Sequence, residues 1–363
     1  MQVIKLFEKL LRFKSITPND DGGLDFIEEY LEDFDSIKIY TDEAKAIFLY
    51  KKFSDGKHLC FSGHIDVVPP GNGWETPPFE PTTKDGYIYA RGAQDMKSGL
   101  ASFIQAIKEL KDFNGTLSIM ITSDEEEDGI GTQNMLSELK KRDFLPDYAV
   151  VAEPTCEETF GDAIKVGRRG SINGILEKVG KQGHAAYPEK TKNPIHKVAQ
   201  VLPKIAGINL DEGDEYFSPS KFVITDIRAG MEVTNVTPDK LKMMFNIRNS
   251  TKTSKKDVEN FIEKYFWDMD YSLVLNQTAK PFVTNKNSKI VKQMQQSIQN
   301  IVHIDTKLST AGGTSDARFF GEYGIDTVEF GVINDTIHKV NERTSIKEVE
   351  NLYKVFKDLL ERF

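Results

Sequence analysis

Acidic and histidine side chains that could hold a metal ion recur along the chain. The segment "GHIDVV" contains His64 and Asp66, "RGAQDMKSG" contains Asp95, and "VAEPT" contains Glu153. Residues two apart on a strand share a face, so the Asp66 carboxylate could take the second N–H of a metal-bound His64. Asp95 has two interpretations: a carboxylate that caps the following helix, or one that bridges two metal ions.

An acidic run, "SDEEEDG", follows the apolar tract that ends at Thr122. A run of charge is usually a solvated loop. Adjacent carboxylates would also let one residue bind metal while its neighbour transfers protons. The sequence leaves both interpretations open for Glu125 and Glu126, and assigns no chemistry to Asp124, Glu127 or Asp128.

A second histidine, His338 in "DTIHKVNE", completes a set of two imidazoles and several carboxylates. The two cysteines, Cys60 and Cys156, do not form a CxxC pair, so a thiolate metal site is not expected. A mixed nitrogen and oxygen ligand set suits catalytic zinc, which keeps one position open for water. A bridging carboxylate suits two ions about 3.5–4 Å apart.

The elements that position these residues alternate between strands and helices. Strands are expected in "HLCFSGHIDVV", "GTLSIMITS" and "DYAVVAEP", and an amphipathic helix in "SGLASFIQAIKELKDF". This alternation predicts an α/β fold, with a mixed sheet and helices on both faces. Functional groups in such sheets collect at the carboxyl ends of strands, where His64, the acidic run and Glu153 are expected.

The middle of the chain has a different order of elements, β-α-β-β-α-β, which is the ferredoxin-like pattern. One helix is expected over "NPIHKVAQVLPKIAG" and another over "SKKDVENFIEKYF". We therefore predict an inserted α+β domain at residues 171–279, within a catalytic domain formed by residues 1–170 and 280–363. The last helix is expected at residues 346–360.

Composition narrows the class of protein. A chain of 363 residues favours two domains, and a net charge of −9 argues against nucleic acid as a partner. The N-terminal "MQVIKLFEKLLRFKS" is an amphipathic helix rather than a signal peptide, and no apolar run is long enough to span a membrane. With two isolated cysteines, these features favour a cytoplasmic protein.

The motifs together resemble the co-catalytic zinc metallopeptidase family of aminoacylases, carboxypeptidases and desuccinylases. The resemblance spans nearly the whole chain. The broader family is marked by "GHIDVVPPG" and "RGAQDMKSG"; the desuccinylase branch is marked by "GRRGS", "QGHAAYPEKTKNPIH", "GGTSDARF" and "IHKVNE". The resemblance implies a zinc-peptidase-like catalytic domain with an inserted dimerisation (lid) domain. It also implies the activity, hydrolysis of the amide bond of N-succinyl-LL-2,6-diaminopimelate in lysine biosynthesis.

Position by position, the resemblance implies two Zn²⁺ per subunit, with Co²⁺ as an alternative in one site. His64 and Glu153 would bind one ion, Glu126 and His338 the other, and Asp95 would bridge them, followed by a cis peptide bond. Asp66 would steady His64, and Glu125 would be the general base. If Glu125 and Glu126 lay on a regular strand they would point to opposite faces, so a twist or bulge is expected there.

The resemblance also implies a homodimer, in which His184 of the partner's inserted domain stabilises the oxyanion. The substrate would be a small anionic N-acyl amino acid. Six positions match family residues that contact it: Arg168, Tyr187, Asn235, Arg248, Gly313 and Thr314. Two alternatives stay open: a deacylase or carboxypeptidase acting on another N-acyl amino acid, and a non-catalytic binding protein on the same fold.

Overall fold

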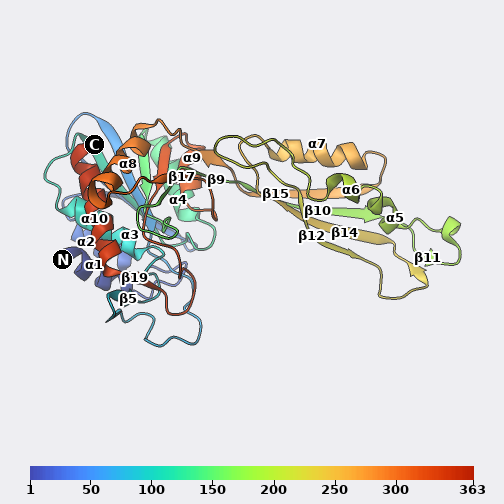
Figure 1. Cartoon of the computed structure of the whole chain (residues 1–363), viewed down its shortest axis with the longest axis horizontal. Helices are drawn as coiled ribbons and strands as arrows, with labels where there is room; N and C mark the ends of the chain where they lie inside the picture. Colours follow the sequence, from blue (N-terminus) through green and yellow to red (C-terminus); the bar gives the residue numbers. More distant parts are fainter. The chain divides into compact units, whose positions relative to one another are not determined.

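The computed structural model describes all 363 residues, which divide into two compact units (Figure 1). Unit 1 comprises Met1–Gly167 and Val283–Phe363, and unit 2 is Arg168–Phe282. The sequence predicts these borders at residues 170/171 and 279/280, within three residues of the observed ones. The short strands β9 (Gly167–Arg168) and β16 (Phe282–Val283) lie where the chain passes from one unit to the other.

The centre of unit 1 is a mixed sheet of eight strands, in the order β1-β2-β6-β3-β7-β18-β8-β17. The four central strands β6, β3, β7 and β18 run parallel to one another. The pairs β1–β2, β2–β6 and β18–β8 are antiparallel. In sheet order, the strands are β1 (Asp35–Tyr40), β2 (Lys45–Lys52), β6 (Gly115–Thr122), β3 (Lys57–His64), β7 (Tyr148–Val151), β18 (Asp326–Glu329), β8 (Ala163–Lys165) and β17 (Lys307–Ser309). The predicted mixed α/β sheet is confirmed.

Helices cover both faces of this sheet. Cys60 and Phe61 are neighbours on β3 and therefore point to opposite faces. Cys60 belongs to a buried cluster with residues of α4 and α9, whereas Phe61 packs on Phe103 of α3 and Phe356 of α10. The helices of unit 1 are α1 (Gln2–Leu11), α2 (Gly23–Tyr30), α3 (Lys97–Lys108), α4 (Ile130–Lys141), α8 (Lys289–Val302), α9 (Ala317–Glu322) and α10 (Ile346–Arg362).

Unit 1 also contains a small three-stranded sheet, in which the strands are paired in the order β19-β5-β4. It consists of β4 (Thr82–Lys84), β5 (Tyr87–Tyr89) and β19 (Arg343–Ser345), so it joins a segment before α3 to a segment near the C-terminus. No helix of the chain is both long and apolar enough to cross a lipid bilayer.

Unit 2 has an antiparallel sheet in the order β12-β14-β10-β15, which is the strand order of a ferredoxin-like fold. Its main elements are β10 (Ser171–Val179), α5 (Pro194–Ala199), α6 (Leu202–Ile205), β12 (Val223–Ala229), β14 (Lys240–Ile247), α7 (Lys255–Phe266) and β15 (Tyr271–Ala279). A short extension contains β11 (Gly183–His184), the 3₁₀ turn η1 (Pro188–Lys190) and β13 (Val236–Thr237).

The expected single helix over residues 193–207 is wrong, because the chain forms α5 and α6 instead. Pro203 explains the break: its ring has no N–H and clashes with the carbonyl four residues earlier, so α5 cannot continue through it. Helix α7 begins cleanly because Ser254 and Asp257 form a capping box.

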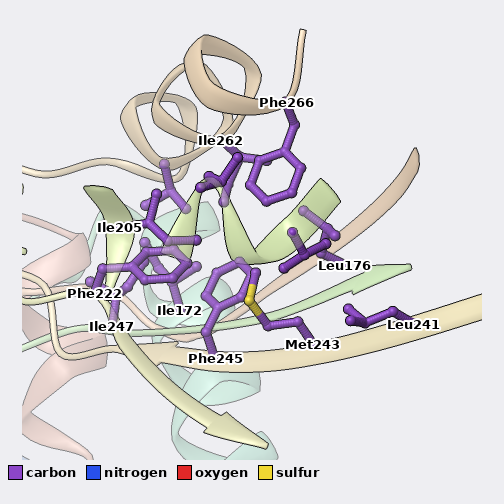
Figure 2. Packing of buried hydrophobic residues seen from close by; sticks show 13 residues of the cluster. Ile172, Leu176, Ile205, Phe222, Leu241, Met243, Phe245, Ile247, Ile262 and Phe266 are labelled. Atoms are coloured by element: carbon purple, nitrogen blue, oxygen red, sulfur yellow. The ribbon is translucent and has the colours of Figure 1, made fainter. Parts of the chain in front are cut away.

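The core of unit 2 lies between α7, α6 and one face of the sheet. Ile262 and Phe266 of α7 point toward Met243 and Phe245 of β14 (Figure 2). Phe222 packs on Phe245 at a ring-centroid distance of 4.4 Å. Burying each such side chain contributes about 1.5–3 kcal/mol, so this cluster is the main source of the stability of unit 2.

Candidate metal centre

Three parallel strands end beside one another, and a candidate ligand lies at or just after each end. Strand β3 lies between β6 and β7 and ends at His64. Strand β6 ends at Thr122, just before the acidic run, and β7 ends at Val151, two residues before Glu153. The predicted placement of these groups at the carboxyl ends of strands is confirmed.

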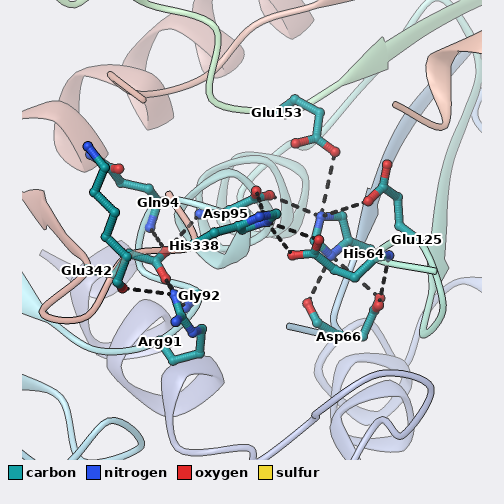
Figure 3. Close-up of polar contacts among 12 residues, drawn as sticks. His64, Asp66, Arg91, Gly92, Gln94, Asp95, Glu125, Glu153, His338 and Glu342 are labelled. Carbon is teal, nitrogen blue, oxygen red and sulfur yellow. Dashed lines mark hydrogen bonds and ion pairs between the residues drawn. The ribbon is translucent and has the colours of Figure 1, made fainter. Parts of the chain in front are cut away.

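Asp95 lies between the two histidines. Its Oδ1 is 3.2 Å from Nε2 of His64, and its Oδ2 is 3.3 Å from Nε2 of His338 (Figure 3). The peptide bond between Asp95 and Met96 is cis, as the resemblance implied. The N-cap of α3 is Met96, without a side-chain hydrogen bond, so the helix-capping interpretation of Asp95 is wrong.

The remaining carboxylates divide between the two histidines. Around His64, Nε2 is 3.6 Å from Oε1 of Glu153 and 3.9 Å from Oε2 of Glu125. Around His338, Nε2 is 3.1 Å from Oε2 of Glu126. Two sets of residues could each hold a metal ion, because within each set the possible ligand atoms lie within 4.8 Å of one another. These sets are His64, Asp95 and Glu126, and His64, Glu125 and Glu153.

The acidic run forms a turn rather than the end of a strand, so the expected twist or bulge of β6 is not what aims Glu125 and Glu126. The turn is closed by a hydrogen bond from the amide of Gly129 to the carbonyl of Asp124 (3.0 Å). Asp124 is buried, and its carboxylate accepts the amide of Gly131 at the start of α4. Glu127 and Asp128 are exposed, which confirms the solvated-loop interpretation for these two residues.

Asp66 holds the imidazole of His64 in place, mainly through its main chain. Nδ1 of His64 is 2.9 Å from the carbonyl oxygen of Asp66 and 3.5 Å from its carboxylate Oδ1. Nδ1 therefore donates its N–H to this carbonyl oxygen, and Nε2 faces the ligand cluster. The other carboxylate oxygen of Asp66 accepts the amide of Glu126 at 3.2 Å, which fixes the turn relative to His64.

Burial and mutual repulsion shift the pKa values of this cluster. Burial raises the pKa of Glu125 and Glu153 well above their usual range, and the neighbouring charge of Asp95 adds to both shifts. Burial lowers the pKa of His64, but hydrogen bonds with Asp66 and Asp95 outweigh it and leave this pKa well above normal. Hydrogen bonds with Asp95 and Glu126 raise the pKa of His338 to about 10.

These shifts reflect several buried carboxylates that are gathered around two imidazoles. The oxygen Oε1 of Glu153 is buried and accepts no hydrogen bond. The negative charges of Asp95, Glu125 and Glu329 also act on this carboxylate. Protons on the histidines supply the charge that the carboxylates require. A bound cation would supply that charge and give Oε1 of Glu153, which accepts no hydrogen bond, a direct ligand contact, so the donor set fits metal ions.

Two residues that the sequence interpretation left without a role lie beside this cluster. Buried Asp316 accepts a hydrogen bond from Oγ1 of Thr132 (2.5 Å), and its charge contributes to the raised pKa of Glu125. Buried Glu342 accepts the amide of Asp95 at 3.1 Å. Both lie in motifs that carried the resemblance, "GGTSDARF" and "IHKVNER", and this was the only signal in the sequence for them.

The expected substrate residues are distributed over both units. Gly313 and Thr314 lie in unit 1, in an exposed loop between β17 and α9. The others belong to unit 2: Arg168, Tyr187, Asn235, Arg248 and the proposed oxyanion donor His184. The candidate metal ligands, in contrast, are all in unit 1.

Three of the unit 2 residues lie together on the short extension. His184 is on β11, and its ring centroid is 5.9 Å from that of Tyr187. The carbonyl oxygen of Asn235 accepts the amide of Ala185 at 2.9 Å. Arg168 is buried at the start of unit 2, and Arg248 is exposed just after β14.

Comparison with known proteins matches residues 60–362 to the model of peptidase family M20/M25/M40. Five curated relatives, 60–66% identical over 99–100% of this chain, are each named succinyl-diaminopimelate desuccinylase. One of them, from Nitratiruptor sp., is 66% identical over 364 residues and is covered completely, as is this chain.

Solved structures share the fold at low sequence identity. Aminopeptidase PepT from Bacillus cereus is 22% identical, with a TM-score of 0.81 over 99% of this chain and 97% of that one. The YXEP protein of Bacillus subtilis, described as a dinuclear metal-binding peptidase, is 14% identical, with a TM-score of 0.71 over 100% of this chain and 98% of that one.

Proposed function

The chain belongs to peptidase family M20/M25/M40, and from this premise we propose that it hydrolyses N-succinyl-LL-2,6-diaminopimelate to succinate and LL-2,6-diaminopimelate. It is a metal-dependent amide hydrolase, and its relatives carry the name of this activity over their full length. The observation that carries the proposal is the position of Asp95, with one carboxylate oxygen beside each histidine. This arrangement is what two metal ions that share a bridging ligand require.

We assign the metal ligands as two sets joined by Asp95. His64 and Glu153 would hold one ion, and His338 and Glu126 the other, with Zn²⁺ in both positions or Co²⁺ in one. When bound, these ions acidify a water molecule and polarise the carbonyl that it attacks. The distances from His64 to Glu153 and from His338 to Glu126 support this division.

Glu125 is the general base in this proposal. It lies on the same side of His64 as Glu153, but no ligand role is assigned to it, and burial raises the pKa of its carboxyl. A carboxylate with a raised pKa is a better proton acceptor. Glu125 takes a proton from the attacking water and later delivers it to the nitrogen of the leaving amine.

The anionic groups of the substrate require cationic partners, and we propose Arg168 and Arg248 for them. The planar guanidinium of arginine can bind a carboxylate through two parallel hydrogen bonds. Tyr187, Asn235, Gly313 and Thr314 would complete the substrate contacts. The assignment of all six rests on the resemblance of their motifs, and the clustering of Tyr187 with Asn235 on one extension supports it.

We also propose a homodimer formed through unit 2, in which His184 of the partner subunit donates to the oxyanion. Strand β12 is an edge of the unit 2 sheet and exposes Val223 and Ile227. An edge strand offers unpaired backbone groups, and exposed apolar side chains add area that a partner could bury. We further propose a cytoplasmic location, which the two buried free cysteines support.

Subunit mixing tests the shared site. His184→Ala and Glu125→Gln homodimers should both be nearly inactive. Mixed dimers should recover part of the native activity, because one of their two sites has both Glu125 and His184 intact. Persistent inactivity, after subunit exchange has been demonstrated by mass spectrometry, would contradict the role of His184.

A panel of N-acyl amino acids tests the substrate. We expect N-succinyl-LL-2,6-diaminopimelate to have the highest kcat/KM among succinylated, acetylated and dipeptide substrates. Negligible turnover of this compound, with rapid turnover of another, would favour the alternative of a related deacylase or carboxypeptidase. Turnover of none, in protein that binds no metal, would favour a binding protein on this fold.

A further inference from the structure

The loop that carries Asp95 is tied to the turn that carries His338 by a buried carboxylate. Glu342 is 1% exposed and follows His338 by four residues. Its Oε1 accepts the amides of Gln94 (2.8 Å) and Asp95 (3.1 Å). Its Oε2 accepts the amide of Gly92 at 3.0 Å (Figure 3). One side chain therefore fixes three amides of the loop that presents the shared carboxylate.

Arg91 supplies the charge that allows Glu342 to be buried. Its Nη1 donates to Oε2 of Glu342 at 2.6 Å, and the arginine is itself 2% exposed. The same nitrogen donates to the carbonyl oxygen of Lys339 at 3.2 Å, within the His338 turn. Nη2 donates to the carbonyl of Pro70 at 3.3 Å, in the segment that follows Asp66. The guanidinium thus joins three segments of the site.

Gln94 ties the other side of the His338 turn to the same loop. Its Nε2 donates to Oδ1 of Asp335 at 2.5 Å, and its Oε1 accepts the amide of Thr336 at 2.8 Å. Thr336 precedes His338 and Glu342 follows it, so the turn is anchored on both sides. Both anchors lead to residues next to, or at, Asp95.

The backbone of the turn requires such support. His338 has a backbone φ of 59° and Asn341 has a φ of 58°, in the left-handed region that residues other than glycine seldom adopt. Such conformations persist where the surrounding structure determines them, and they concentrate at functional sites. The imidazole of His338 is half exposed, so packing alone does not fix its position.

We propose that Glu342, together with Arg91 and Gln94, is a positioning residue that sets the distance between the Asp95 carboxylate and the His338 imidazole. The inference rests on the proposed metal centre, because these two groups would hold the same ion. Glu342 touches neither metal nor substrate in this assignment. It acts through the two ligands, by fixing the backbone that presents each of them.

Glu342→Gln is the direct test. The replacement keeps the shape of the side chain but turns one acceptor oxygen into an NH₂ group that faces N–H donors. The variant should bind Zn²⁺ between about tenfold and 100-fold more weakly than the unmodified chain, as is usual when a group that orients a ligand is lost. Affinity is measured on metal-free protein by competition with a zinc-chelating dye, and kcat and KM are measured on the loaded protein.

Asp162→Asn is a matched control. The carboxylate of Asp162 also accepts three backbone amides, those of Glu157, Glu158 and Thr159, in unit 1. That loop carries none of the candidate ligands. The control should lose thermal stability but keep native zinc affinity. If Glu342→Gln acts only on stability, it should show the same pair of results.

Native zinc affinity in Glu342→Gln, with a lowered melting temperature alone, would overturn this inference and leave the metal centre intact. If the unmodified chain binds no zinc, the metal centre fails, and this inference fails with it. If Glu342→Gln does not fold, zinc affinity is measured on Gln94→Ala instead. This variant keeps the ion pair between Glu342 and Arg91 and removes the side-chain hydrogen bonds of Gln94 with Asp335 and Thr336. Weakened zinc binding in that variant supports the inference, and unchanged binding overturns it.

Discussion

The two sheets of the molecule are buried in different ways. In unit 1, all eight residues of β6 are buried, and β3 is buried at every position after Lys57. In unit 2, burial alternates along β14 and β15, and side chains such as Val274 of β15 are exposed. The first sheet is covered on both faces, whereas the second has a covered face and an exposed one.

This difference determines where each unit can carry polar function. Charged side chains cannot project from the faces of the unit 1 sheet without being buried, so they collect where the strands stop. His64 and Glu153 lie at such ends. The exposed face and edge of the unit 2 sheet are instead free to meet another molecule, and this is the surface that we assign to a second subunit.

Removing metal ions should have the largest effect, and it should separate the two units. A chelator should abolish turnover and destabilise unit 1 alone, because all the candidate ligands belong to it. A ligand present at 1,000 times its Kd stabilises the folded state by about 4 kcal/mol. Calorimetry with and without Zn²⁺ should show a shift in the transition of unit 1. An equal shift of both units, or of neither, would contradict the assignment of the metal ions to unit 1.

Glu125→Gln should give the next largest effect. General-base catalysis contributes about 10²–10⁴-fold, so kcat should fall by that factor. Zinc content should stay at the native level, because Glu125 has no ligand role in the assignment. The two readouts are steady-state kinetics and metal analysis of the same sample. A large loss of zinc would move Glu125 from base to ligand, and native turnover would place the base elsewhere.

Phe222→Ala should damage unit 2 and spare the site in unit 1. Phe222 is fully buried and packs on Phe245 and Phe261, so its loss leaves a large cavity. Truncating a buried phenylalanine costs about 3–5 kcal/mol. Urea unfolding should show this loss in unit 2, while zinc affinity stays native. A matching fall in zinc affinity would show that the two units do not behave separately.

The buried His58 should give a smaller, pH-dependent effect confined to unit 1. Burial lowers the pKa of His58 to about 4, beside Ser118 and Phe144. The unfolded chain, with a histidine pKa near 6.5, binds more protons between these values. The contribution of neutral His58 to the free energy of unfolding is therefore complete above about pH 6.5. About 3 kcal/mol of it is lost as the pH falls toward 4.

His58→Asn isolates this contribution from other titrating groups, such as Asp124. The unfolding free energy of metal-free protein, measured at pH 7 and pH 4.5, should fall less in the variant than in the unmodified chain. Identical pH dependence in both proteins would contradict the lowered pKa of His58. The unit 2 core cluster, which consists of apolar side chains, should show no corresponding dependence.

The sequence predicted best where the signal was local. Apolar runs located β3, β6 and β7, and the residues just after them are therefore at strand ends. Pro203 is also a local signal, but it lies within a longer helical pattern that predicts one helix over residues 193–207, where the structure has two.

What could not be predicted depends on contacts between distant segments. Glu342 lies about 250 residues from the amides that it accepts, so no spacing in the sequence indicates the pairing. The direction of Glu125 and Glu126 depends on a turn that Asp66 and Gly129 stabilise, not on the strand before it. The roles of the substrate residues in unit 2 stay predictions, because the resemblance of their motifs is the main support for them.

We propose above that unit 1 holds metal ions beside its strand ends and hydrolyses a succinyl amide with their help. The most direct test of this proposal is the turnover of N-succinyl-LL-2,6-diaminopimelate by metal-free protein during a titration with Zn²⁺. We expect no turnover without metal, and activity that rises and levels off at two equivalents of Zn²⁺ per chain. Turnover by the metal-free chain, or none at any zinc concentration, would contradict it.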